Sequence, residues 1–428
     1  MTSHPPHQGS PRRLLQLVHA YPPAVGGVER STRDLCERLV AEHGFDVTVL
    51  TTDVLTVSAF RDASLPRMDA AADEVQNGVR VQRFPVVTRL AAPLRLLQSV
   101  AYRLGLPGND LLRTWWSGPI SPGLRRAAER ASGFDVVCAA SFPLNHMRYA
   151  FRVPGRPPVV LVGAVHTTDA WAFDRPCLLR LVNRSYATVA HTEHERDWLV
   201  AHGCDPARIR VIGHGVDEEE LRPRRGAFRV LHGIDPDAYL VGFVGQQGAH
   251  KGLDTLVAAL PALLEHCPDA FVAIGGARTP YSQTLERLAA ELPASARERL
   301  VIAHDLDEQE KADLLGDVDV FASPSRAESF GITTLEAWSL GKPVVVGDAP
   351  SQREIVDDGV TGIIVPHASR DALVAALRRL AAPAARRYMG EAGKAVVAAR
   401  YGRREIEGRY AALLEEAIEA GRASGRKT

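Results

Sequence analysis

The sequence lacks the patterns that mark several large classes of protein. It contains neither a GxGxxG fingerprint nor a GxxxxGK[ST] loop, which argues against a dehydrogenase and against a P-loop NTPase. No apolar run approaches the roughly 20 residues of a membrane span, and the run that follows the polar N-terminus is too short and too polar for a signal peptide. Lys+Arg and Asp+Glu both total 51, so net charge gives no support for nucleic-acid binding.

Cysteine is also scarce, and its spacing shows no metal or disulfide pattern. The five cysteines include no CxxC pair and are odd in number, as expected for reduced thiols of a cytoplasmic protein. His191 and His194 lie three residues apart and could share a helix face. No third ligand accompanies them, so we expect no metal site.

Positive charge is concentrated in one stretch of this neutral protein. Residues 80–134 hold nine arginines against two acids, a local net charge of +7. Within it, APLRLLQSVAYRLG is predicted to form a helix over Pro93–Leu104 with Leu94, Leu97, Ala101 and Leu104 on one face. The helix either packs on its own domain, which is the commoner case, or contacts a membrane surface. The second alternative would make the protein peripheral at the inner membrane face.

The remaining sequence alternates between strand and helix patterns, which predicts an α/β fold with parallel sheets. A chain of 428 residues is long enough for two such domains. A charged connector with Gly and Pro follows GHGVD, so we place the domains at residues 1–222 and 223–403, with a ligand cleft between two Rossmann-like, doubly wound halves. Strands are predicted at several segments, among them Val79–Phe84, Val136–Ala140 and Val159–Val162.

The most informative segment is ESFGITTLE, where Glu328 and Glu336 flank a turn that opens a helix. Backbone N–H groups and the helix dipole make such a turn an anion site. Carboxylates beside an anion site are suited to holding hydroxyl groups. A ligand with a central diphosphate and polyols at both ends, such as a nucleotide sugar, fits this layout.

Other candidate residues lie at predicted strand ends. Gly26 and Gly27 sit in a strand–helix loop, and GQQGAHKGLDTL places Gly245, Gln246 and Lys251 in a second one. Lys251 is either a phosphate-binding cation or an ordinary solvated lysine, and GGARTPYS brings another cation, Arg278. His166 ends a strongly apolar strand, a position that favours function over a structural role.

Together GGVER, the strand-end histidine, GVD, the KG loop and E-x7-E resemble glycosyltransferase family 4 over nearly the whole chain. The resemblance implies a GT-B fold and retaining transfer from a UDP- or GDP-linked sugar to an acceptor hydroxyl. It also implies that residues 1–222 bind the acceptor, that residues 223–403 bind the donor, and that a last helix within 404–428 crosses back to the first domain.

The resemblance also implies site roles. Glu328 would hold the donor sugar and Glu336 the ribose, Lys251 would neutralise the phosphates, and His166 would position and stabilise the reacting sugar. The residues that would contact the donor are Gly26, Gly27, Gly245, Gln246, Lys251, Arg278, Glu328, Phe330, Gly331, Ile332, Thr333 and Glu336. No metal or other cofactor is implied, because fixed positive groups would stabilise the leaving diphosphate.

One residue departs from the family pattern. An arginine usually follows the first glycine of the loop, and Gln246 stands there instead. We expect Arg278 or Arg326 to supply the missing charge. The rival interpretations are a GT-B phosphorylase, a nucleotide-sugar epimerase and a non-catalytic sugar-nucleotide-binding protein. The acceptor is not identified, and the basic, Trp-containing stretch is compatible with a lipid-linked one.

Overall fold

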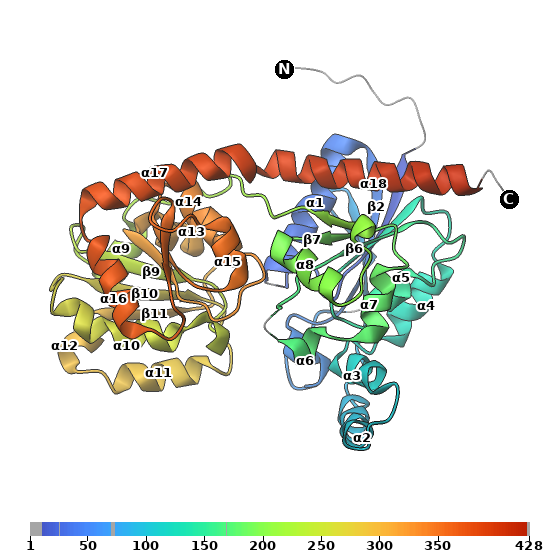
Figure 1. Cartoon of the computed structure of the whole chain (residues 1–428), viewed down its shortest axis with the longest axis horizontal. Helices are drawn as coiled ribbons and strands as arrows, with labels where there is room; N and C mark the ends of the chain where they lie inside the picture. Colours follow the sequence, from blue (N-terminus) through green and yellow to red (C-terminus); the bar gives the residue numbers. More distant parts are fainter. Residues whose placement is uncertain (1–10, 25, 70–72, 168, 426–428) are drawn as a thin grey trace. The chain divides into compact units, whose positions relative to one another are not determined.

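The computed structural model describes residues 11–24, 26–69, 73–167 and 169–425, and the chain forms two compact units (Figure 1). Unit 1 comprises Met1–Ile212 with Glu407–Thr428, and unit 2 comprises Gly213–Ile406. The expected boundary at residue 222 falls inside unit 2. The reason is local packing, since Val216 pairs with Gly402 as a β-bridge and belongs to an apolar core of unit 2.

Unit 1 is built on an eight-stranded sheet that is parallel except at one edge. Its buried strands are runs of apolar and β-branched residues, as expected where helices cover both faces. The antiparallel edge strand is β3. In spatial order the strands are β3 (Asp73–Gln76), β4 (Val79–Phe84), β2 (Phe45–Thr52), β1 (Arg12–Leu17), β5 (Val136–Ala140), β6 (Val159–Val162), β7 (Ala187–Ala190) and β8 (Ile209–Val211).

The helices of unit 1 include the final helix, which contacts the sheet through ion pairs and hydrogen bonds. Arg12 of β1 pairs with Glu415, and the Tyr186 hydroxyl donates to Glu416 at 2.7 Å. The helices are α1 (Gly27–His43), α2 (Ala91–Arg103), α3 (Asn109–Ser117), α4 (Pro122–Arg130), α5 (Met147–Ala150), α6 (Ala170–Phe173), α7 (Pro176–Val182), α8 (Glu193–Ala201) and α18 (Arg403–Gly425), whose first residues belong to unit 2. Short 3₁₀ turns lie at Val57–Phe60 and Pro206–Arg208.

Helix α2 does not bury the face that the sequence predicts. Ala91, Gln98 and Ala101 are buried, whereas Leu97 and Leu104 are exposed. The helix packs chiefly on α3, and the Gln98 side chain donates to the Asn109 side chain at 2.7 Å. The helix thus packs on its own unit, but of the predicted face only Ala101 is fully buried, and its leucines do not form the contact. In the described part of the chain, no helix is long and apolar enough to cross a membrane.

Unit 2 has a six-stranded parallel sheet in which chain order reverses between β9 and β12. In such a doubly wound sheet, ligands bind beyond the carboxyl ends of the strands at this switch point. The strands are, in spatial order, β11 (Leu300–His304), β10 (Phe271–Gly276), β9 (Leu240–Val244), β12 (Val320–Ser323), β13 (Val344–Gly347) and β14 (Gly362–Val365).

Two apolar cores cover the two faces of this sheet, and alternate residues of β9 serve each. Val241 and Phe243 face the core formed with α10, α11, α12 and α16, while Leu240 and Val244 face that formed with α9, α13, α14, α15 and α17. The helices are α9 (Ala227–Leu231), α10 (Leu253–Leu264), α11 (Ser282–Ala290), α12 (Ala294–Arg297), α13 (Glu308–Asp317), α14 (Ile332–Ser339), α15 (Pro350–Ile355), α16 (Arg370–Arg379) and α17 (Pro383–Arg400).

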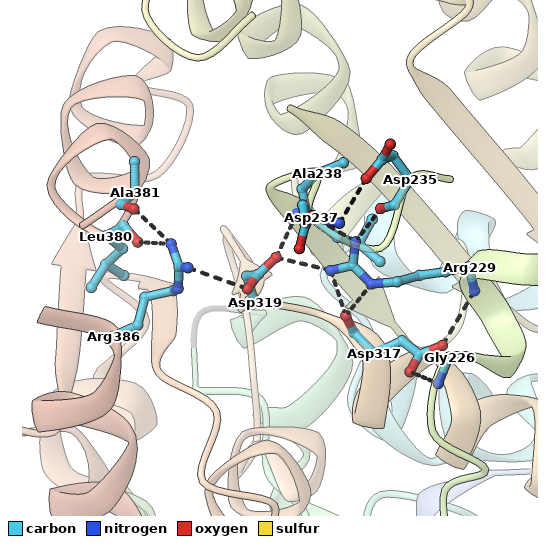
Figure 2. Close-up of polar contacts among 11 residues, drawn as sticks. Gly226, Arg229, Asp235, Asp237, Ala238, Asp317, Asp319, Leu380, Ala381 and Arg386 are labelled. Atoms are coloured by element: carbon cyan, nitrogen blue, oxygen red, sulfur yellow. Dashed lines mark hydrogen bonds and ion pairs between the residues drawn. The ribbon is translucent and has the colours of Figure 1, made fainter. Parts of the chain in front are cut away.

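A polar network fixes the amino ends of the two switch-point strands (Figure 2). The Arg229 guanidinium donates to the Asp317 carbonyl and, at 2.9 Å, to the Asp319 carboxylate. Asp319 also accepts the Leu240 N–H, the first of β9, at 2.9 Å, and Arg386 lies 3.5 Å from its other oxygen. These contacts hold β9 and β12 together at one end and leave their carboxyl ends to carry functional loops.

Candidate functional site

The loops that follow β9 and β12 bring two sequence-predicted residues together. Lys251 ends a short 3₁₀ turn (Ala249–Lys251) after β9, and Glu328 lies in the loop after β12. The Lys251 ammonium is 2.6 Å from a carboxylate oxygen of Glu328, and both side chains are largely buried. The Ser351 hydroxyl donates to the Glu328 carbonyl at 2.8 Å. A cation and an acid thus meet at the switch point of unit 2.

The N-terminus of α14 follows at once and is held by Gln352. Gly331 begins the helix with φ +104°, and a Cβ there would lie 2.2 Å from the Gln352 amide nitrogen. That nitrogen donates to the Phe330 carbonyl at 2.7 Å. No side chain caps the helix, so Ile332 and Thr333 present main-chain amides at a positive dipole end. This arrangement is suited to an anion.

Glu336 lies on the same helix and is only 2% exposed. Its carboxylate is 2.8 Å from the Lys311 ammonium, which α13 provides. Sequence reasoning did not identify Lys311. The available signal was its spacing, because Lys311 precedes the buried Leu314 and Leu315 by three and four residues and therefore shares their helix face.

The two arginines proposed to replace a missing cation occupy different surroundings. Gln246 is exposed at the end of β9. Arg278 follows β10, and its guanidinium donates to Glu286 at 2.9 Å. Arg326 donates from its backbone to the His250 carbonyl at 2.7 Å and from its side chain to Asp254 at 2.5 Å. Arg326 is therefore bound to the turn that carries Lys251.

In unit 1 the glycine loop after β1 is held by a buried acid. A Cβ on Gly26 would lie 2.2 Å from the Glu29 carboxylate. Glu29 is 2.9 Å from His19, whose other ring nitrogen is 2.7 Å from the Ser141 hydroxyl after β5. Burial raises the pKa of Glu29, but attraction and hydrogen bonding from His19 outweigh it and hold that pKa below its usual value. Gly27 begins α1 directly after this anchored turn.

His166 lies after β6 on a loop that a second buried acid supports. The Glu195 carboxylate accepts the N–H groups of Ala164 and Val165 at 3.1 Å and that of His191 at 2.7 Å. Ala164 has φ +113°, a conformation that non-glycine residues rarely adopt. The loop is therefore strained and held by α8. Sequence reasoning missed Glu195, although its place in the first turn after the Thr192 cap marks an acid that can reach backbone amides.

His194 contacts the loop of His166, whereas the ring of His191 contacts the segment after β8. A His194 ring nitrogen is 2.8 Å from the Thr167 hydroxyl, and a His191 ring nitrogen is 3.3 Å from the Ile212 carbonyl. The His166 ring lies 5.5 Å from that of Phe173. Within the described ranges, no group of three or more His, Cys, Asp or Glu side chains is placed to hold a metal ion.

Comparison with protein families gives a match in each half of the chain. Residues 25–220 match the model described as Glycosyltransferase Family 4. Residues 225–396 match the model described as Glycosyl transferases group 1. The second match contains Lys251, Glu328 and Glu336, and the first contains His166.

Curated relatives and a solved structure agree with these matches. A D-inositol 3-phosphate glycosyltransferase of Xylanimonas cellulosilytica is 34% identical over 93% of this chain and 94% of its own. A GDP-mannose-dependent α-(1-6)-phosphatidylinositol monomannoside mannosyltransferase of Mycolicibacterium smegmatis is 28% identical over 89% and 92%. Sucrose-phosphate synthase of Thermosynechococcus elongatus has the same fold, with TM-score 0.73 and 19% identity over 96% of this chain and all of that one.

Proposed function

Because the chain belongs to the family 4, group 1 glycosyltransferases of GT-B fold, we propose that it transfers a sugar from a UDP- or GDP-linked donor to an acceptor hydroxyl with retention of configuration. The observation that carries the proposal is the 2.6 Å contact between Lys251 and Glu328 beside the uncapped start of α14. It brings together a cation, a carboxylate that can accept hydrogen bonds from hydroxyl groups, and backbone amides at the carboxyl edge of one sheet.

Donor binding follows from these groups. The diphosphate would accept hydrogen bonds from the backbone amides between Phe330 and Thr333, and Lys251 would offset its charge. An ammonium has three donors, so Lys251 can keep its contact with Glu328 while it binds a phosphate oxygen. Glu328 would hold hydroxyls of the sugar and Glu336 those of the ribose, with each such bond worth about 1.5–3 kcal/mol.

Rate enhancement would come from stabilising the departing diphosphate as its charge grows, through Lys251 and the helix dipole. These groups are fixed before reaction, so we propose that the transfer needs no metal. A phosphate oxygen of the leaving group would take the acceptor's proton on the face from which the diphosphate departs. His166 would position and stabilise the reacting sugar, and Gly26 and Gly27 would allow close approach of unit 1's backbone to the donor.

The charge missing at Gln246 is proposed to come from Arg326 rather than from Arg278. Arg326 is hydrogen-bonded to the turn that carries Lys251, whereas Arg278 forms an ion pair with Glu286 on the far side of β10 in the chain. Arg326→Ala should therefore weaken nucleoside diphosphate binding by about tenfold or more, while Arg278→Ala should leave it within about twofold. Equal effects from both variants, or none from Arg326→Ala, would contradict this assignment.

The acceptor and the cellular site are also proposed. Phosphatidylinositol monomannoside is part of the name of the Mycolicibacterium smegmatis relative, and residues 80–134 of this chain carry net positive charge. A lipid-linked or other anionic acceptor suits that charge. We propose a cytoplasmic enzyme that contacts the inner face of the membrane through this region.

A thermal-shift panel of UDP- and GDP-sugars, with and without EDTA, tests donor choice first. The proposal expects one nucleotide series to raise the melting temperature regardless of EDTA, and expects Glu328→Gln and Glu336→Gln to reduce that shift. Glu265→Gln, an exposed acid of the same unit, is the control. Product formed from the α-linked donor should keep the anomeric configuration by NMR. An inverted product, or a shift that EDTA abolishes, would refute the corresponding part of the proposal.

A further inference from the structure

The largest concentration of exposed apolar side chains in the described structure lies on the hairpin formed by α2 and α3. Of the sixteen large hydrophobic residues that are exposed, seven fall within residues 90–106. They are between 43% and 68% exposed, and they are Leu90, Leu96, Leu97, Val100, Tyr102, Leu104 and Leu106. Contiguous apolar surface of this kind marks an interaction site, because single exposed hydrophobics are normal but clusters are not.

The hairpin is inverted relative to an ordinary surface helix. Helix α2 turns Ala91, Gln98 and Ala101 inward, and Leu96, Leu97 and Val100 outward. The inward face is settled by packing on α3 and by the 2.7 Å hydrogen bond from Gln98 to Asn109. If α2 were rotated about its axis, the leucines would be buried and the Gln98 amide would be exposed, which is the opposite of what the structure shows. The outward apolar face is thus a built feature of unit 1.

The charges around this face are almost all positive. Arg89 and Arg103 are exposed at the two ends of α2, and Arg95 lies on it with its guanidinium 5.6 Å from the Trp116 ring centre. The one acid of the hairpin, Asp110, is turned inward, where it accepts the Cys177 N–H at 2.6 Å. Within residues 89–117 the exposed charged side chains are therefore all cationic, and they lie among exposed apolar ones.

Tryptophans extend the surface from α3 to α6. Trp115 and Trp171 are exposed, and the rings of Trp116 and Trp171 lie 6.0 Å apart, with Arg113 5.3 Å from the Trp171 ring centre. Indoles are suited to the boundary between hydrocarbon and water, because one edge is apolar and the N–H is polar. Figure 1 shows α2 and α3 projecting from the sheet of unit 1, with α6 next to α3.

We propose that the α2–α3 hairpin inserts its leucine face into the headgroup region of an anionic lipid bilayer while Arg89 and Arg103 bind lipid phosphates. The inference rests on the peripheral membrane contact of the proposed function and names the surface that makes it. A second copy of the chain is a poorer occupant, because a two-fold interface brings the same patch of both copies together, and the exposed charges of the hairpin are all cationic. An anionic leaflet complements both the apolar and the cationic parts.

Flotation with phosphatidylglycerol/phosphatidylcholine vesicles tests the inference on the full chain. Each leucine withdrawn should weaken partition by about tenfold, so Leu96→Gln/Leu97→Gln/Leu104→Gln should bind about a thousandfold more weakly. Arg89→Gln/Arg103→Gln should lose about fivefold for each charge, and the loss should shrink in high salt. Val230→Gln/Leu231→Gln, which alters two exposed apolar residues of α9, is the matched control and should bind like the unaltered protein.

The possible results distinguish a failure of the membrane inference from a failure of the proposed transferase activity. If the leucine variant binds as tightly as the control, the hairpin is not the contact surface, whatever the protein does at membranes. If the unaltered protein binds no vesicle, both membrane statements are wrong, while nucleotide-sugar binding measured in solution still decides the proposed reaction. If the unaltered protein self-associates and the leucine variant is a monomer, the face is an interface between copies and the lipid inference is overturned.

Discussion

Removing the ammonium of Lys311 should destabilise unit 2 and disturb nucleotide binding through Glu336. The two charges are 2.8 Å apart, and the Glu336 side chain is only 3% exposed. Breaking a buried pair by deleting one partner costs about 3–5 kcal/mol, because it leaves an uncompensated charge. We expect Lys311→Met to cost about 3 kcal/mol, near the lower limit, since Lys311 is itself 18% exposed and water can reach the acid. For a unit of this size the melting temperature should fall by about 6–12 °C.

The double variant Lys311→Met/Glu336→Gln separates stability from binding. Neither position 311 nor position 336 is charged in this variant, so most of the lost stability should return, with a coupling energy of about 2 kcal/mol or more between the two sites. Affinity for the nucleoside diphosphate should not return, because the carboxylate that would grip the ribose is gone. Calorimetric unfolding and titration calorimetry measure the two quantities. Two results would refute the reasoning: a Lys311→Met protein as stable as the unaltered one, or a double variant less stable than Lys311→Met alone.

Three further predictions concern the loops and a buried histidine. Gly331→Ala should lower the unfolding free energy by on the order of 1–3 kcal/mol and weaken diphosphate binding, because the added Cβ would meet Gln352. Gly341, at the other end of α14, also has a positive φ but has open space around it, so titration calorimetry should find the binding of Gly341→Ala unchanged. Glu195→Gln should lower kcat by about tenfold with little change in donor affinity, since it loosens the loop of His166, whereas the exposed Glu193→Gln should change neither. Burial lowers the pKa of His146 to about 3, so the stability that the neutral ring contributes is complete above about pH 6.5 and is lost as pH falls toward 3. In urea titrations over this range, the unfolding free energy of His146→Gln should therefore fall less steeply than that of the unaltered protein, by about 1.4 kcal/mol per pH unit.

Several strands were predictable to the residue, among them β4, β5 and β6. In β5 and β6 the signal is a continuous buried apolar run, as expected where helices cover both faces of the sheet, whereas in β4 it is the alternation of buried and less buried residues. The proximity of Lys251 and Glu328 was predictable for a related reason. Each follows a switch-point strand, so both lie at the carboxyl edge of the sheet, where ligands bind in doubly wound folds. Their roles there stay a prediction.

Helix α17 shows what local patterns do not contain. Its packing face includes Gly390 and Gly393, where a Cβ would lie 1.9 Å from the Gly341 carbonyl oxygen and 2.2 Å from the Trp338 ring. Glycines interrupt the apolar positions Met389 and Val397 on this face, so the periodic signal is weak and the 18 residues of the helix were not predicted. The support that Glu195 and Lys311 give to other residues depends on tertiary contacts between separate elements, which sequence spacing alone does not specify.

The order in which the ribosome makes this chain has a consequence for unit 1, whose final helix follows unit 2 in the sequence. Unit 2 is one uninterrupted segment, so all of its residues are translated before the helix that completes unit 1. The sheet of unit 1 must wait, with Arg12 lacking Glu415 and the place of the buried Tyr410 empty, until some two hundred further residues have been translated. A chain that ended after Ile406 would carry every residue of the second unit and an incomplete first one, which is the form that chaperones and proteases would meet.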